Sequence, residues 1–255
     1  MAKASGGTRS GSGNTDYRQM NRNNADAIKQ KYNTPWFTDL INSPAGGMDL
    51  VGYHDDISKV FQQFGLPAPE MGYDGSGRNP RIYADAEDKE GGRVKLYRSF
   101  FLDSNGDLVV DHDLFRVPKS MQGNGFSKAI MRALYKHYKE AGVKKIVVFA
   151  NIDVGGYTWG RYGFSVKNKS AAEEVIAEAR RQRAPLHILR SAKSVVENFY
   201  NSHSANTPFP MNLLADKSYG KELLKGTDWS GRIDLTDATQ RKVFEDYMNG
   251  KRPKK

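Results

Sequence analysis

The first candidate for chemistry in this sequence is a glycine-rich turn with the sequence Gln-Gly-Asn-Gly-Phe-Ser, at Gln122–Ser127. A strand-like run, Leu108–Val117, precedes the turn, and a helix-like run, Lys128–Ala141, follows it. A turn from a strand into a helix N-terminus presents backbone N–H groups backed by the positive end of the helix dipole. Because glycine has no Cβ, an anion can approach the main chain closely. The segment therefore predicts a site for a pyrophosphate group.

The turn does not match two common nucleotide-binding motifs. The dinucleotide fingerprint requires a third glycine where this sequence has Lys128, and no βαβ start precedes the turn. A Walker loop requires Gly-Lys followed by Ser or Thr, which does not occur at the required spacing. Two interpretations remain, an ordinary loop or the pyrophosphate site of a different cofactor.

The spacing between the turn and the preceding strand favours the cofactor. Val117 ends the strand, and Gln122 opens the pattern Gln-x-x-Gly-x-Ser five residues later. This register resembles the acetyl-CoA motif of the GNAT superfamily of N-acetyltransferases, Gln/Arg-x-x-Gly-x-Gly/Ala, with Ser127 at the last position. A second stretch is similar to the family too. Asn151 follows a strand-like run, and an aromatic residue, three further residues and Gly-Phe come next, at Trp159–Phe164.

The resemblance covers about residues 81–166 and implies an α+β fold with a mixed, mostly antiparallel central sheet flanked by helices. It implies that acetyl-CoA is the cosubstrate and that an acetyl group is transferred to an amine. The residues implied to bind acetyl-CoA are Phe115, Val117, Gln122, Gly123, Asn124, Gly125, Phe126, Ser127, Lys128 and Asn151. An Asn after a strand is also a routine helix cap, which is the alternative for Asn151.

The resemblance also indicates two aspartates as candidates for the general base. Members of the family often carry the base four or six residues before the terminal Val, and these positions are Asp113 and Asp111. Both share the parity of Val117, so we expect both on one side of the strand, with His112 facing away. The same alternation argues against a metal site here, and we predict none. The alternative is that the two aspartates only solubilise a strand near a hairpin.

The general acid departs from the family pattern. The family commonly has a Tyr four residues before the Gly of Gly-Phe, but this sequence has Trp159, which cannot protonate a thiolate. Tyr157 or Tyr162 would substitute through a shifted helix. Alternatively the thiolate leaves without assistance, because a thiol ionises readily near neutral pH.

The composition excludes several classes of protein. The 255 residues contain no cysteine, which rules out disulfides, thiolate zinc sites and a cysteine nucleophile. No apolar run approaches the roughly 18–20 residues that a membrane span requires, and Met1–Asn14 lacks the apolar core of a secretory signal. We therefore expect a soluble, cytoplasmic protein. The net charge of +10 favours anionic partners such as nucleic acid, an acidic protein surface or a phosphate-rich cofactor.

The chain divides into three predicted parts. Residues 1–24 form a basic tail without apolar periodicity, which we expect to be disordered. Residues 25–168 are expected to form the acetyltransferase-like domain, and residues 169–255 a helical extension that returns a strand near 231–235. Strands are predicted at 81–86, 93–102, 108–117 and 145–150, and helices at 25–41, 55–64, 128–141, 171–183, 191–201, 217–224 and 237–248. The segment 72–79 is predicted to be a loop.

Three functions are compatible with these patterns. The first is an acyl-CoA-dependent N-acetyltransferase, and the second is a degenerate member of the same fold that binds without catalysis. The third is a basic nucleic-acid-binding or virion-associated protein. Trp159 at the usual Tyr position favours the second, whereas the intact glycine-rich turn argues against it. The acceptor is an amine, and the length of the flanking segments favours a protein, peptide or nucleic-acid-linked amine.

Overall fold

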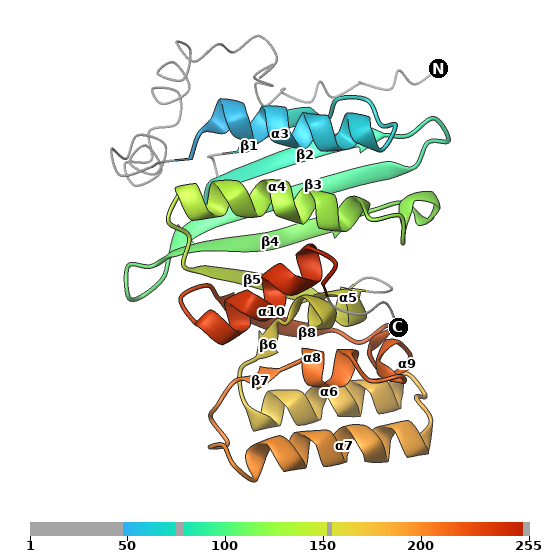
Figure 1. Cartoon of the computed structure of the whole chain (residues 1–255). Coiled ribbons are helices and arrows are strands. Elements are labelled where there is room, and N and C mark those ends of the chain that lie inside the picture. The colour runs from blue at the N-terminus through green and yellow to red at the C-terminus, as the bar shows by residue number, and fades with distance from the viewer. Residues whose placement is uncertain (1–47, 75–78, 152–154, 252–255) are drawn as a thin grey trace, which may run out of the picture.

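The computed structural model describes residues 48–74, 79–151 and 155–251 (Figure 1). They form an α+β fold in which a mixed eight-stranded sheet, in the order β1-β2-β3-β4-β5-β8-β6-β7, is flanked by helices. The prediction of an α+β fold with a mixed sheet flanked by helices is therefore confirmed. The predicted tail at 1–24 and the predicted helix at 25–41 lie outside the described residues. In the described ranges no helix combines the length and the apolar character needed to cross a lipid bilayer.

The strands differ widely in length, and only one described pair is parallel. The strands are β1 (Glu70–Asp74), β2 (Arg81–Glu87), β3 (Arg93–Leu102), β4 (Leu108–Arg116), β5 (Lys145–Ala150), β6 (Ser165–Val166), β7 (Phe209–Pro210) and β8 (Trp229–Asp234). β4 and β5 run parallel, and the other described pairs are antiparallel. The helices are α3 (Leu50–Gln63), α4 (Phe126–Glu140), α5 (Gly155–Tyr162), α6 (Lys169–Arg181), α7 (Leu186–Tyr200), α8 (Asn212–Ala215), α9 (Gly220–Leu224) and α10 (Ala238–Met248), with a 3-10 turn at Lys119–Met121.

The two faces of the sheet are covered differently. Figure 1 shows α3, α4 and α10 on one face, which we call the helical face. On β5, Ile146 and Val148 point to this face and are buried, whereas Phe149 points to the opposite face and is 54% exposed. Strand alternation extends this division to the residues paired with them on β4 and β8.

The central helix α4 is fixed on the sheet by a stripe of large side chains. The buried residues recur every four positions, which places them on one side of a helix: Phe126, Ile130, Leu134 and Tyr138. The Phe126 ring lies 5.4 Å from Phe61 of α3, and the Tyr138 ring lies 6.3 Å from Phe100 of β3. At the N-terminus of α4 the Phe126 ring also lies 6.5 Å from Phe115 near the end of β4.

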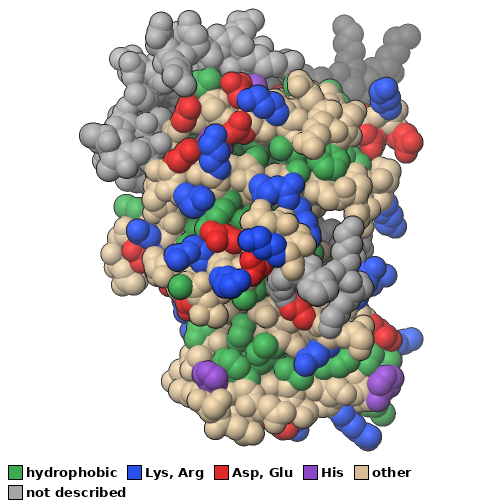
Figure 2. Space-filling model, in the orientation of Figure 1, with side chains coloured by type: hydrophobic (Ala, Val, Ile, Leu, Met, Phe, Trp, Pro, Cys, Tyr) green, Lys and Arg blue, Asp and Glu red, His purple; other side chains and the backbone are tan. Residues whose placement is uncertain are grey.

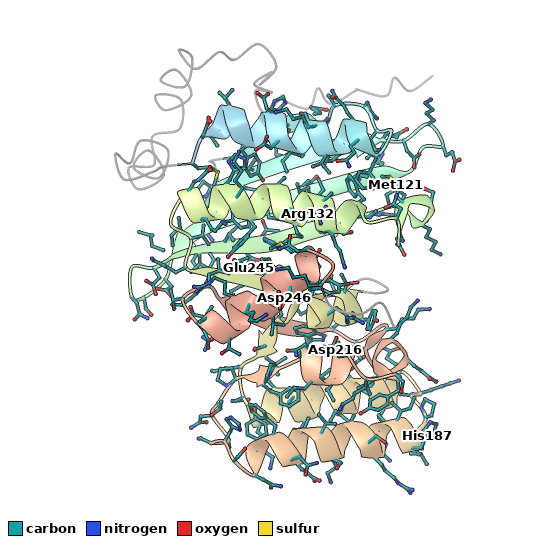
Figure 3. All side chains as sticks on the ribbon, viewed as in Figure 1. Met121, Arg132, His187, Asp216, Glu245 and Asp246 are labelled. Carbon is teal, nitrogen blue, oxygen red and sulfur yellow. The ribbon has the colours of Figure 1, made fainter. Side chains whose placement is uncertain are left out.

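The C-terminal part of the chain completes the same sheet. β8 lies between β5 and β6 and pairs with β5 along its full length. The strand predicted near 231–235 is thus observed at Trp229–Asp234. α10 then crosses to α4, where Arg132 donates a hydrogen bond to the carbonyl oxygen of Met248 (2.7 Å) and the Tyr135 hydroxyl donates one to Glu245 (2.8 Å). Figure 3 shows Arg132 and Glu245 where α4 and α10 face each other.

The prediction of a loop at 72–79 is wrong at its start, because β1 extends to residue 74 and pairs with β2. The glycine that argued for a loop is instead required by packing across the pair. Gly72 stands opposite Tyr83, and a Cβ built on Gly72 would lie 1.8 Å from the Tyr83 side chain. The absence of a side chain at residue 72 therefore makes room for the tyrosine ring.

This packing predicts the outcome of a double-mutant cycle. Gly72→Ala should destabilise the fold by about 1–3 kcal/mol, the usual cost of overpacking. In a Tyr83→Ala background the same substitution should cost much less, because the clashing ring is gone. Thermal unfolding of the four proteins measures the coupling. Equal effects of Gly72→Ala in both backgrounds would contradict the packing argument.

Candidate functional site

The parallel strands β4 and β5 separate before they end. Their pairing runs from Val109 with Lys145 to His112 with Val148, yet β4 continues to Arg116 and β5 to Ala150. Along the facing edges of these strand ends, the backbone groups of β4 and β5 are therefore not hydrogen-bonded to each other. A cavity of about 590 Å³ lies at the separation, and we call it the cleft.

A β-bulge in β4 accompanies this separation. The register between β3 and β4 shifts between Tyr97 and Ser99, so that His112 and Asp113 together stand opposite Arg98. An extra residue on one strand bends that strand and re-aims the side chains beyond it. The bulge therefore bends β4, so that the end of the strand turns away from β5.

A buried arginine supports the bulge from inside the core. Arg98 is completely buried, and its Nη1 donates hydrogen bonds to the carbonyl oxygens of Tyr97 (2.7 Å) and Leu114 (2.9 Å). Its guanidinium also lies 5.6 Å from the centre of the Phe115 ring. Satisfying the Leu114 carbonyl in this way lets β4 leave regular pairing without a buried unpaired acceptor.

The bulge also changes the face of the sheet to which Phe115 points. Counting alternate residues from Asp111 and Asp113 places Phe115 on the same face as the two aspartates. In the structure Phe115 pairs with Leu96, and its ring lies 6.5 Å from Phe126 on the helical face. Simple alternation fails here because the strand contains one residue more than its partner.

The two predicted bases share the opposite face but differ in their contacts. The Ser99 hydroxyl donates to Asp113 Oδ2 (2.6 Å), and Arg81 Nε lies 3.3 Å from the same oxygen. Asp111 is half-buried and makes no hydrogen bond or ion pair with any part of the chain that the structure describes. Burial and the charge of Asp113 raise the pKa of Asp111 to about 6, although Arg98 and Arg81 oppose the shift. Asp111 is thus the carboxylate that is available to accept a proton near neutral pH.

The glycine-rich turn has the form that an anion site requires. Gly123 and Gly125 adopt φ angles of +81° and +97°, and a Cβ built on either would meet nothing within 4 Å. Gln122 Nε2 donates to the carbonyl oxygen of Val117 (3.2 Å), which ties the turn to the end of β4. The first turn of α4 carries no acidic side chain. The first N–H groups of α4 have no carbonyl partner within the helix, and of these the Phe126 N–H donates to the Asn124 side chain.

The cleft brings together six of the predicted site residues, and the others do not line it. Those that line it are Asp113, Phe115, Val117, Gln122, Ser127 and Asn151. Asn124 accepts a hydrogen bond from the Phe126 N–H (3.0 Å), and Phe126 itself is buried. Lys128 points to α10, where its ammonium lies 4.1 Å from the centre of the Tyr247 ring.

Neither predicted tyrosine lines the cleft. Tyr162 is buried between Tyr247 and Phe244, with ring centres 4.7 Å and 5.7 Å away, and burial raises its pKa well above the usual value. The Tyr157 hydroxyl accepts a hydrogen bond from Arg161 (3.3 Å). The geometry therefore gives no support to either tyrosine as the general acid.

Sequence reasoning missed His112, which lines the cleft from the helical face. Alternation does turn it away from the two aspartates, but the cleft passes between the strands and reaches both faces. His112 is 3% exposed, its Nε2 lies 3.0 Å from the Tyr138 hydroxyl, and its Nδ1 has no partner among the described residues. Burial and the charge of Arg98 hold its pKa well below the usual value, so the ring is neutral. The only signal in the sequence was its position between the two aspartates.

The lining of the cleft is cationic. Lys95, Arg116 and Lys119 contribute to it, and among the described lining residues only Asp113 is acidic. Lys95 and Arg116 are directly paired across β3 and β4, and on its other side Lys95 is directly paired with Asp85 of β2. Figure 2 shows Lys and Arg side chains over α4 and α10 on the helical face, with Asp and Glu side chains among them. The site as a whole suits a ligand with several negative charges.

Comparison with protein-family models finds no match, and no curated protein is significantly similar to the sequence. The function is therefore inferred from the geometry of the cleft and of the strand β4 that lines it.

The burial of Asp111 and the nearby charge of Asp113 predict a pH-dependent effect on stability. A carboxyl whose pKa is raised in the folded state stabilises the fold at low pH, and this contribution is lost as the pH rises from about 4 through about 6. Asp111→Asn should therefore raise the melting temperature relative to the parent protein more at pH 7.5 than at pH 4. A melting-temperature difference that does not depend on pH would contradict the raised pKa.

In Asp113→Asn the titration of Asp111, followed by carboxyl NMR, should move to lower pH because a neighbouring negative charge is removed.

Proposed function

We propose that this protein is an N-acetyltransferase of the GNAT type, which transfers an acetyl group from acetyl-CoA to an amine. The observation that carries the proposal is the separation of β4 from β5 directly beside a glycine-rich helix N-terminus. This arrangement combines a seat for a pyrophosphate, unpaired strand edges and a cavity in one place. No cysteine nucleophile is needed for such a transfer, because the amine attacks the thioester directly.

The residues of the cleft fit the chemistry of acetyl-CoA. The N–H groups of the Gln122–Ser127 turn and the start of α4 suit the pyrophosphate, apart from those of Gln122 and Phe126, which donate to Lys119 and Asn124. The backbone edge of β4 from Phe115 to Val117, where the Val117 carbonyl already accepts from Gln122, suits the amides of the pantetheine arm, which would add to β4 as an extra strand. Asn151 would bond one of these amides, and the cationic lining suits the remaining phosphate.

Asp111 is the residue that we assign as the general base. In the reaction the amine nitrogen forms a bond to the thioester carbonyl carbon, the carbon–sulfur bond breaks, and the amine loses a proton. A carboxylate with a pKa of about 6 is a better acceptor for this proton than an ordinary aspartate. Asp113, which is paired with Arg81, acts as a positioning residue by raising the pKa of Asp111.

His112 is the residue that we assign to stabilise the developing negative charge. The guanidinium of Arg98 acts on Tyr138 electrostatically, which favours the orientation in which the hydroxyl oxygen faces the guanidinium and its proton faces His112. Tyr138 then donates to His112 Nε2, and the proton of the neutral imidazole resides on Nδ1. A fixed N–H donor in a buried site suits an oxyanion or a departing thiolate. This role replaces the tyrosine that the family commonly has where this chain has Trp159.

Substitution of the turn tests the binding of acetyl-CoA. In Gly125→Glu a carboxylate enters the proposed pyrophosphate seat, and like charges about 4 Å apart near a protein surface cost about 4 kcal/mol. The Kd for acetyl-CoA, measured by isothermal titration, should rise at least about 100-fold.

The matched control is Gly106→Glu, in the hairpin between β3 and β4. Gly106 also has a positive φ angle (+78°) and open space around its Cα, so the strain and the added charge are the same. It should bind acetyl-CoA as the parent protein does. Unchanged affinity in a folded Gly125→Glu variant would refute the cofactor site.

Substitution of the base tests catalysis separately from binding. Asp111→Asn should lower turnover by about 100-fold or more, the usual contribution of a general base, and leave acetyl-CoA affinity nearly unchanged. In the parent protein the rate should rise with pH through about 6 as Asp111 loses its proton, and this limb should be absent from the residual activity of the variant.

Asp113→Asn is the control on the same strand and face. It should retain more activity than Asp111→Asn, with the rising limb moved to lower pH. Acetyl-CoA binding without turnover of any amine by the parent protein would instead support the degenerate binding module. Binding of nucleic acid without binding of acetyl-CoA would support the third function.

A further inference from the structure

A row of paired side chains crosses the opposite face of the sheet next to the cleft. Asp111 of β4 pairs with Val147 of β5, Val147 pairs with Arg232 of β8, and Arg232 pairs with Ser165 of β6. Directly paired residues point to the same face of a sheet. Asp111 and Arg232 therefore share one face and stand two strands apart, which is about 10 Å between their Cα atoms.

A second cavity, of about 370 Å³, lies over this row, and we call it the trough. Asp111 lies at one end, Arg232 and Lys167 at the other, and Phe149 with small and aliphatic residues of β5 and β8 between them. Phe149 also lines the cleft, so the two cavities meet at this side chain. The volume of the trough is that of a small-ligand site.

The charges along the trough are not neutralised by their neighbours. Arg232 and Lys167 are exposed, and neither has a carboxylate within ion-pair distance in the described ranges. Asp111 likewise has no cation within ion-pair distance there, although the charges of Arg98 and Arg81 act on it from farther away. Between them Phe149 is 54% exposed, although large apolar side chains usually gain by burial. The trough thus presents a negative end, an apolar middle and a positive end.

We propose that the trough is the acceptor site of the acetyl transfer and takes an amine that carries an anionic group several bonds away. This inference rests on the proposed function. The ammonium group would lie at Asp111, the carboxylate or phosphate at Arg232 and Lys167, and the spacer on Phe149. Asp111 takes the proton from the ammonium, and the nitrogen attacks the thioester that is presented through the cleft.

The spacing and the charges exclude two simpler acceptors. An α-amino acid holds its two charges one carbon apart, which is too close to reach both ends of the trough. A diamine would bring a second ammonium group to Arg232 and Lys167, where like charges repel. An ω-amino carboxylate, an aminoalkyl phosphate, or the end of a longer molecule with such a group fits both ends.

The experiment compares amines of equal length. Thiol release from acetyl-CoA is measured with 6-aminohexanoate, 6-aminohexyl phosphate, hexylamine and 1,6-diaminohexane. At least one of the two anionic amines should have a kcat/KM about tenfold above that of hexylamine, the effect of one charge-assisted hydrogen bond, with the diamine lowest. The ranking of the first two probes tells carboxylate from phosphate.

Substitutions of Arg232 test whether the trough causes the preference for anionic amines. Arg232→Gln should bring the kcat/KM ratio of the preferred anionic amine to hexylamine close to one, and Arg232→Glu should favour the diamine. The control is Arg190→Gln, an exposed cation of α7 remote from β8 in sequence and outside both cavities, which should keep the parent ratio.

The outcomes separate this inference from the proposed function. Acetyl-CoA binding without discrimination among the four amines, or a ratio that Arg232→Gln leaves unchanged, would overturn the acceptor class alone. Failure of the parent protein to bind acetyl-CoA in isothermal titration would overturn the proposed function, and the acceptor class with it.

Discussion

The hydrogen bond from Arg98 of β3 to the Leu114 carbonyl, directly after the β4 bulge, is the interaction on which the proposed site depends. A guanidinium without a carboxylate partner is costly to bury, and two of its nitrogens, Nε and Nη2, have no acceptor among the described residues. Arg98 donates a hydrogen bond to the Leu114 carbonyl oxygen at the point where β4 leaves regular pairing with β3. Without that donor, a regular ladder between β3 and β4 would be the more stable arrangement.

Two structural consequences follow from the bulge, and an electrostatic one follows from Arg98 itself. The end of β4 turns from β5, which opens the cleft beside the glycine-rich turn. Phe115 turns to the helical face while Asp111 and Asp113 stay on the opposite face. The charge of Arg98 also acts on His112, which stays neutral, and on Asp111, whose pKa it lowers against the effect of burial. One residue therefore links the shape of the site to its electrostatics.

The elements with strong local patterns were predictable from sequence. β3 and β5 begin and end where alternation and flanking turns predicted, and α4 begins two residues earlier than predicted because Phe126, directly after the turn, already belongs to it. β6 and β7 were missed because two residues cannot show a period. β1 was missed because Gly72 was taken as a turn residue, whereas only its contact with Tyr83 on the neighbouring strand explains it.

The site was predictable only in part for a similar reason. The turn and the two aspartates carry local signals, but the difference between the aspartates depends on Arg81 and Ser99, which come from other strands. The bulge cannot be read from the β4 sequence, since the register is set by Arg98 on β3. The trough depends on β8, which enters the sheet about 80 residues after β5 (Ala150 to Trp229).

The central claim is that acetyl-CoA occupies the cleft between β4 and β5. The most direct measurement is the change of backbone amide NMR signals when acetyl-CoA is added to the labelled protein. The account predicts the largest changes at residues 115–117, at residues 122–128 and at Asn151, with small changes on α6 and α7. Changes confined to the basic surface of α4 and α10, or none at saturating acetyl-CoA, would contradict it.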